Sequence, residues 1–136
     1  PPMNFLNTKV FKDSKGIGIE VHEHKIYLDQ AKYDVPEVNE YVGKAVIAGI
    51  RPESLSDAPA KVETAKPAGA VFPAKVDVVE KLGAQSYVYT TVGDLIITAS
   101  VDPIHSQSKV GDQIELALDP LRVVLFDKET ENTIIS

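Results

Sequence analysis

The sequence predicts an all-β domain, a small antiparallel sandwich or barrel with long loops. Several short segments alternate apolar and polar residues with a period of two, and clusters of Gly, Pro, Asn and Asp separate them. No segment of about 10 to 12 residues keeps a helical period, which disfavours βαβ architectures. The 136 residues, 43% hydrophobic and 25% charged, match one ordinary globular domain. We therefore expect a single domain over residues 1–136.

The clearest strand is Gln113–Asp119. Its Ile114, Leu116 and Leu118 would point to one face of a sheet, while the polar residues point to the other. Pro120 ends this pattern, because proline has no N–H to donate to a strand ladder. The segment therefore predicts a half-buried strand.

Two hairpins are also expected. Within Tyr87–Val101, two β-branched and aromatic runs flank Gly93-Asp94, where the glycine can supply the positive φ of a tight turn. Earlier in the chain, Gly18–Val21 and Lys25–Leu28 can pair across the polar turn His22-Glu23-His24.

Two more strands and a long loop complete the expected order. Lys44–Ile50 and Lys75–Leu82 have strand composition, and the second ends at Gly83. Ser54–Gly69 is rich in Ala, Ser, Asp and Pro and is predicted to be a loop. Within this loop, Ala58–Lys66 lacks the apolar spacing that would indicate a helix.

The motif for nucleotide hydrolysis is missing from the sequence. That chemistry uses a glycine-rich loop with GxxxxGK[ST] spacing, whose amides hold the phosphates. Gly16-Ile17-Gly18 and Gly43-Lys44 are short fragments of such a pattern and lack its remaining positions. We interpret both as strand ends or turns and expect neither ATP nor Mg²⁺ to bind this chain.

Catalytic and metal-binding patterns are equally weak. His22 and His24 are two residues apart and could share a strand face, but spacing places no third ligand beside them, and a polar turn explains them. Ser100, Ser106 and Ser108 lack the G-x-S-x-G context of a hydrolase nucleophile. We expect no catalytic residue and no metal site.

Charge and composition restrict the partners and the location. Asp and Glu number 20 against 14 Lys and Arg, and the net charge of −6 disfavours a nucleic-acid partner. No apolar run approaches the roughly 20 residues of a transmembrane helix. Pro1–Leu6 does not resemble a secretory signal, and cysteine is absent, as is usual in a reducing compartment. We expect a cytoplasmic location.

Two features remain open between structure and recognition. In Arg51-Pro52-Glu53, a rigid proline separates opposite charges at the end of a predicted strand. This segment can be a structural clamp, a contact surface or both. Phe126 follows three aliphatic residues, and its ring can belong to the core or to a buried interface.

Four motifs, in order, carry a resemblance to a known family: Pro1–Leu6, Gly49–Glu53 (GIRPE), Val78–Gly83 (VVEKLG), and Gly111-Asp112 with Leu125–Asp127. Together they resemble the C-terminal region of ATPase subunits from maltose and multiple-sugar ABC transporters. That region carries the oligonucleotide-binding-like (OB) fold called TOBE. The charged stretch Lys12–Asn39 contains no motif that we can match.

The resemblance implies an OB-type antiparallel β-barrel of the TOBE/MOP kind, joined to an ATPase domain upstream of Pro1 that would hold ATP and Mg²⁺. It also implies a homodimer that tethers two ATPase subunits, membrane subunits reached through the parent protein at the inner face of the membrane, and, in some relatives, a cytoplasmic regulatory protein. By motif position, the candidate interface residues are Gly43, Gly49, Arg51, Pro52, Glu53, Glu80, Gly83, Gly111, Phe126 and Asp127.

Three other functions are weighed against this one. Related TOBE domains bind oxyanions between subunits, so a small-ligand module for an oxyanion or a sugar is the alternative, although no obvious Ser/Lys/Arg nest is present. A nucleic-acid-binding OB fold would need exposed aromatic residues and a basic groove, against 7% aromatic residues and an acidic charge here. An independent enzyme has no motif to support it.

Overall fold

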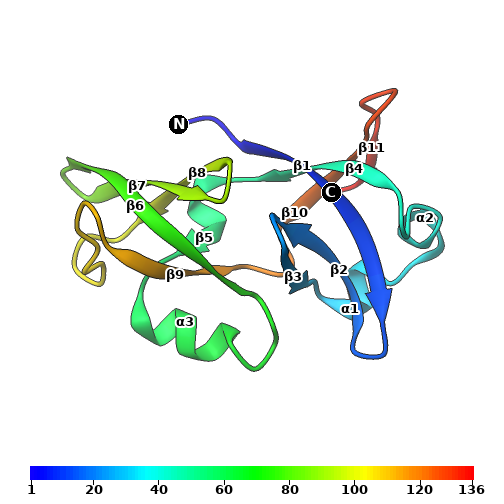
Figure 1. Ribbon diagram of the computed structural model, residues 1–136, viewed down its shortest axis with the longest axis horizontal. Coiled ribbons are helices and arrows are strands. Elements are labelled where there is room, and N and C mark those ends of the chain that lie inside the picture. The colour runs from blue at the N-terminus through cyan, green and yellow to red at the C-terminus, as the bar shows by residue number, and fades with distance from the viewer.

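A computed structural model describes all 136 residues, which form two antiparallel sheets (Figure 1). The first sheet has the order β11-β10-β4-β1-β2-β3 and the second β5-β9-β6-β7-β8. The first sheet contains β1 (Asn4–Asp13), β2 (Gly16–Val21), β3 (His24–Tyr27), β4 (Ala45–Ile50), β10 (Val123–Asp127) and β11 (Thr133–Ile135). The second contains β5 (Leu55–Ser56), β6 (Val71–Leu82), β7 (Gln85–Val92), β8 (Leu95–Val101) and β9 (Gln113–Leu118). The helical segments are α1 (Gln30–Tyr33), α2 (Pro36–Asn39), the 3₁₀ turn η1 (Pro52–Ser54) and α3 (Pro59–Ala65).

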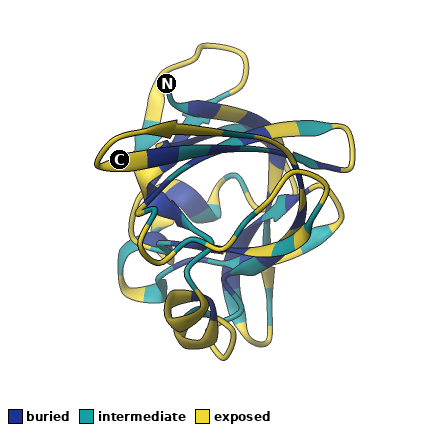
Figure 2. Cartoon of the chain, turned by 90° about the vertical axis from the view of Figure 1, so that its left-hand side faces the viewer, coloured by how far each residue is buried: buried dark blue, intermediate teal, exposed yellow.

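Both sheets contribute to one core. A contiguous cluster of 26 buried residues includes side chains from β1, β2 and β4 as well as from β6, β7 and β9. Exposed residues concentrate in the loops and along α3 (Figure 2). Removing the apolar side chains of this buried cluster from water is the main favourable contribution to folding. The predicted all-β architecture is confirmed, and the shared core suits a single domain.

The predicted strands and hairpins are confirmed. The β7–β8 hairpin turns at Gly93-Asp94, with Gly93 at φ +60° and Val92 paired with Leu95. β2 and β3 pair across His22-Glu23. The strand expected at Gln113–Asp119 is β9, with Leu116 and Leu118 buried.

The prediction of a loop over Ser54–Gly69 is wrong, because this stretch contains the short strand β5 and the helix α3. Pro59 occupies the first turn of α3, where its fixed φ suits a helix and its missing N–H costs nothing. Alanines in α3 add favourable helix propensity. Only Val62 is buried in this helix, so the apolar period that usually reveals a helix is absent.

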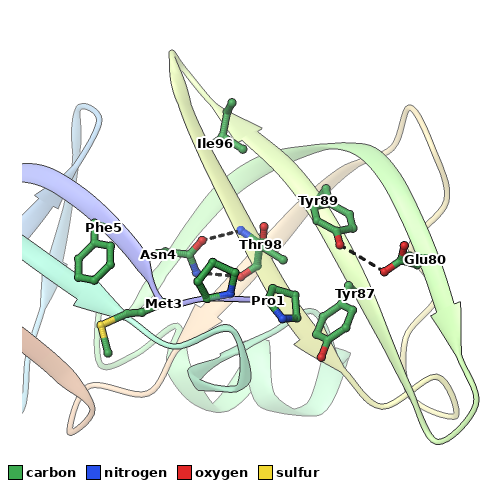
Figure 3. A pocket seen from close by; sticks show the side chains of 10 residues that line it. Pro1, Met3, Asn4, Phe5, Glu80, Tyr87, Tyr89, Ile96 and Thr98 are labelled. Atoms are coloured by element: carbon green, nitrogen blue, oxygen red, sulfur yellow. Dashed lines mark hydrogen bonds between the residues drawn. The ribbon is translucent and has the colours of Figure 1, made fainter.

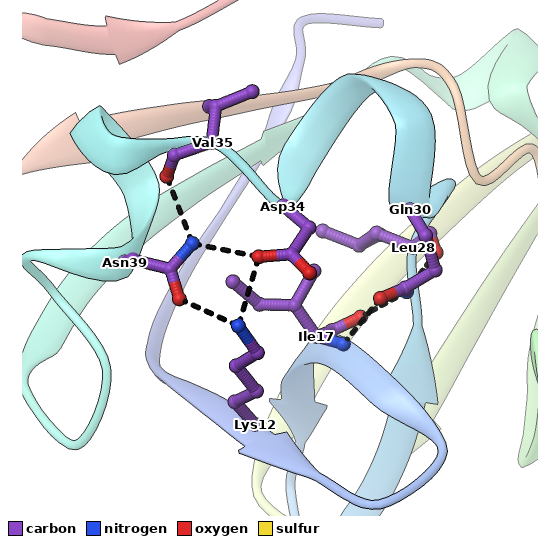
Figure 4. A network of polar contacts seen from close by, with 7 residues as sticks. All are labelled: Lys12, Ile17, Leu28, Gln30, Asp34, Val35 and Asn39. Atoms are coloured by element: carbon purple, nitrogen blue, oxygen red, sulfur yellow. Dashed lines mark hydrogen bonds and ion pairs between the residues drawn. The ribbon is translucent and has the colours of Figure 1, made fainter.

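The unmatched stretch Lys12–Asn39 supplies β2 and β3 of the first sheet, and polar side chains hold its helical part to the neighbouring strands (Figure 4). The Gln30 amide accepts a hydrogen bond from the Ile17 N–H at 2.8 Å and donates one to the Ile17 carbonyl at 2.9 Å. The Lys12 ammonium lies 3.0 Å from an Asp34 carboxylate oxygen, which also accepts a 2.7 Å hydrogen bond from Asn39. Asn39 and then Lys12 lower the pKa of Asp34. The charges of this stretch thus have a structural role.

Tyr33 joins α1 to the C-terminal part of the first sheet. Its buried hydroxyl donates to the Val123 carbonyl at 2.6 Å and accepts from the Val123 N–H at 2.8 Å. Burial raises the pKa of Tyr33. Both backbone groups of Val123 are therefore satisfied by one side chain.

Candidate interaction site

The outer face of the first sheet carries an apolar cluster. Phe5 on β1 and Val124 on β10 both lie opposite Gly49 on β4, and Phe126 lies opposite Ile47. The alternation that buries their neighbours turns these side chains outward. Phe5 is 63% exposed, which is unusual for a large aromatic side chain.

Gly49 allows this cluster to close over the middle of the sheet. A Cβ atom there would lie 2.4 Å from the Met3 sulfur and 3.1 Å from the Phe126 ring. The Phe5 and Phe126 ring centroids are 6.1 Å apart in a tilted arrangement. We call Met3, Phe5, Ile47, Val124 and Phe126 the outer patch.

A groove adjoins the outer patch where the N-terminal segment crosses the second sheet (Figure 3). Its volume is about 580 Å³, within the usual size range of ligand pockets. We call it the tyrosine groove, and its lining residues are Pro1, Pro2, Met3, Asn4, Phe5, Glu80, Tyr87, Tyr89, Ile96 and Thr98.

The polar groups of the tyrosine groove come from three neighbouring strands. Glu80 on β6 lies opposite Tyr87, and Tyr89 on β7 lies opposite Thr98 of β8. The Tyr89 hydroxyl donates to Glu80 Oε1 at 3.3 Å, and partial burial together with this carboxylate raises the pKa of Tyr89. Glu80 is the one charged side chain lining the groove.

Asn4 ties the two sheets together beside the groove. Its buried side-chain amide donates to the carbonyl of Ile50 at 3.1 Å and to that of Thr98 at 2.8 Å. Its carbonyl oxygen accepts from the Thr98 N–H at 2.8 Å. The N-terminal wall of the groove is thereby fixed against β8.

The GIRPE corner lies close to the groove. Pro52 is buried at the start of η1, whereas Arg51 and Glu53 are exposed. Neither charged side chain forms an ion pair within the chain. Pro52 and Glu53 line a smaller hollow that also contains Tyr87. Proline therefore shapes the corner and leaves both charges free for a partner.

Asp127, in contrast, is engaged within its own chain. It accepts the Tyr41 hydroxyl at 2.6 Å and the N–H groups of Glu129 and Thr130 at 2.9 Å each. The Tyr41 hydrogen bond, followed by the Thr130 N–H, lowers the pKa of Asp127 from 3.8 to about 2. This carboxylate organises the turn between β10 and β11.

The remaining candidates are turn glycines at separate places. Gly43, Gly83 and Gly111 have φ of +82°, +70° and +91°, a region that favours glycine. The structure thus brings Gly49 and Phe126 together in the outer patch and places Glu80 in the groove. Their role in an interface stays a prediction.

Sequence reasoning missed the outward-facing aromatic residues Phe5, Tyr87 and Tyr89. Tyr87 and Tyr89, two residues apart in a predicted strand, had to share a face, and this signal was available. Phe5 gave no such signal, because its exposure depends on strand pairing far along the chain.

His22, Ser106 and Ser108 each contact an acidic residue that is distant in the sequence. His22 Nδ1 lies 3.7 Å from Asp94 Oδ1 across two turns. Ser106 and Ser108 both donate to Asp57 Oδ2. No group of three or more His, Cys, Asp or Glu residues is placed to hold a metal ion.

Comparison with known proteins identifies related chains. The family model described as "MalK OB fold domain" matches residues 1–55, and "TOBE domain" matches residues 67–125. Trehalose/maltose import ATP-binding protein MalK of Thermococcus litoralis is 33% identical over 136 residues, covering 98% of this chain and 35% of that protein. Oligosaccharides import ATP-binding protein MsmX of Bacillus subtilis is 33% identical over 132 residues, covering 96% and 34%. The chain spans about a third of the length of these relatives.

The fold has a counterpart among solved structures. The cytoplasmic molybdate-binding protein ModG, with molybdate bound, superposes with a TM-score of 0.68 at 16% identity, covering 90% of this chain and 94% of that chain. This likeness concerns the fold and confirms the predicted TOBE/MOP-like barrel of OB type. The chain belongs to the family of MalK OB-fold and TOBE domains found in the ATP-binding subunits of sugar-import ABC transporters. The stretch Lys12–Asn39, which lacked a motif, lies inside the first match. No helix of the chain has the length and apolar character needed to cross a membrane.

Proposed function

We propose that this chain is the regulatory and dimerisation domain of the ATP-binding subunit of a carbohydrate-importing ABC transporter. The names of the relatives support this assignment, since they are sugar-import ATP-binding proteins. ATP and Mg²⁺ would bind an upstream domain of the parent protein. That protein would act at the cytoplasmic face of the membrane, with the transporter's membrane subunits.

The outer patch is the observation that carries the dimerisation proposal. Aromatic and methionine side chains are enriched at the centres of protein interfaces, and Phe5 and Phe126 lie together on an open sheet face. A second copy related by a two-fold axis would offer the same surface, so each patch would bury the other. Such a contact would raise the effective concentration of the two ATPase domains for each other.

Sedimentation of the chain at increasing concentration tests this proposal. We expect reversible dimers, and we expect Phe5→Ala and Phe126→Ala each to weaken association about tenfold, a loss of about 1.4 kcal/mol. Ile104→Ala is the matched control, because Ile104 is 85% exposed and lies outside the patch. A monomer at high micromolar concentration, or equal effects of all three variants, would contradict the proposal.

A regulatory partner would find free charges at the GIRPE corner. Arg51 and Glu53 are exposed and unpaired, and rim charges of this kind set association rate and specificity. In this proposal a cytoplasmic regulatory protein docks at the corner. Charge reversal at both positions should then slow its association without changing self-association of the chain.

A further inference from the structure

We infer that the tyrosine groove binds a neutral saccharide of one or two rings. The groove shares Met3 and Phe5 with the outer patch, but the side chains on which this inference depends, Tyr87, Tyr89 and Glu80, lie outside the patch, so the two functions can be tested separately. The inference rests on the shape of the groove, its unused hydrogen-bonding groups and its charge.

The groove offers aromatic surface at a suitable spacing. Tyr87 and Tyr89 are half-buried on the outer face of β7, two residues and therefore about 7 Å apart along the strand. A sugar ring has an apolar face of C–H groups, which packs on an aromatic side chain while its hydroxyl groups remain at the rim. Tyrosine suits such a ligand, since it joins an apolar ring to a polar tip.

Several polar atoms in the groove retain hydrogen-bonding capacity. Glu80 uses Oε1 for Tyr89, and its second oxygen has no partner. The Tyr87 hydroxyl accepts from Gln85 Nε2 at 2.8 Å, so its own proton is free to donate. The Thr98 hydroxyl forms no hydrogen bond within the chain, and it lies in the groove (Figure 3). Unused acceptors and donors together match a ligand whose hydroxyl groups do both.

The charge of the groove separates a saccharide from an anion. No Lys or Arg lines it, and its one charged side chain is the Glu80 carboxylate. An oxyanion would lose its hydration and meet a like charge, so it is disfavoured. A neutral polyol instead gains an acceptor from the same carboxylate.

The groove is also preformed. Asn4 fixes its N-terminal wall to β8 through the Thr98 backbone, and its floor is the continuous ladder of β7 with β8. Binding would therefore require little ordering of the protein, which lowers the entropic cost.

A titration of the ¹⁵N-labelled chain with maltose and with trehalose, followed by two-dimensional NMR, tests the inference. We expect saturable shifts confined to β7, β8 and residues 1–5, with a Kd of about 1 mM for at least one sugar. Tyr87→Ala should weaken binding at least about tenfold, and Tyr87→Phe, which keeps the ring, should weaken it less. Ile104→Ala should leave binding unchanged, and the dispersion of each spectrum reports whether the variant is folded.

Three results would overturn the inference: no shifts at about ten times that Kd, shifts that Tyr87→Ala and Glu80→Gln leave unaffected, or saturation of the groove by molybdate or a polyproline peptide and not by either sugar. Sedimentation of the same samples keeps the two proposals apart. Tyr87→Ala should leave self-association unchanged, so loss of sugar binding and loss of dimerisation are separate outcomes.

Discussion

The two sheets share one core but have different outer faces. The first sheet presents Phe5 and Phe126 around Gly49, with no hydrogen-bonding side chain among them. The second presents Tyr87 and Tyr89 beside a carboxylate and a hydroxyl group. The same strand alternation fills the core from both sides, so the inward residues determine the fold and the outward residues determine what each sheet can bind.

The largest expected effect tests whether the two sheets are one unit. Phe72 on β6 is 1% exposed in the shared core, and Phe72→Ala should lower the free energy of unfolding by about 3–5 kcal/mol. Because the core is contiguous, amides of β1 and β7 should lose protection together in hydrogen exchange. Protection that persists in β1 while β7 exchanges would show that the sheets unfold separately.

A smaller loss is expected at the tie between the sheets. Asn4→Ala removes three hydrogen bonds and leaves the Thr98 N–H without its partner. We expect a loss of about 1–3 kcal/mol in urea denaturation. Asn7→Ala is the control, since Asn7 is exposed on the same strand. Equal losses in both variants would mean that the tie contributes nothing specific.

Sequence patterns could predict the strands, but not the side-chain hydrogen bonds that join distant parts of the chain. Alternation in β9 and the glycine turn of the β7–β8 hairpin are local signals, and both were sufficient. Asn4 and Thr98 are 94 residues apart, and Tyr33 and Val123 are 90 apart. Nothing local indicates that these pairs meet. Helix α3 escaped prediction because a short helix with one buried residue has no periodic face.

For the candidate site, as for the fold, the sequence identified single positions but not which residues lie together. Gly49 and Phe126 were identified from motifs, yet only strand pairing shows that they meet beside Phe5 and Met3. Asp127 was expected at an interface or in its support; its hydrogen bonds organise a turn, and its place in an interface stays a prediction. A motif marks a position that matters, and geometry is needed to say whether it matters for packing or for contact.

Acid should affect the first sheet in a defined pH range. Hydrogen bonds from Tyr41 to Asp127 and from Tyr27 to Asp13 are the largest causes that lower the pKa of each carboxyl from 3.8 to about 2. A lowered pKa stabilises the fold above the unfolded value, and this contribution is lost as the pH falls from about 4 to 2. Asp127→Asn should flatten the dependence of unfolding free energy on pH in that range. The control is Glu53→Gln, an exposed position without a hydrogen bond, and an unchanged slope for Asp127→Asn would contradict the assignment.

The smallest expected effect distinguishes a contact surface from a structural one. In Gly49→Ala, the new Cβ meets mainly the flexible end of Met3, which can move, so unfolding free energy should change by no more than about 0.5 kcal/mol. Gly18→Ala is the contrasting variant, because its Cβ would lie 2.1 Å from the Ile26 carbonyl oxygen, which is backbone and cannot yield cheaply. Moving Met3 and Phe126 should nevertheless weaken self-association measured by sedimentation. If Gly49→Ala destabilised the fold as much as Gly18→Ala, the outer patch would be part of the packing and not a free surface for a second copy.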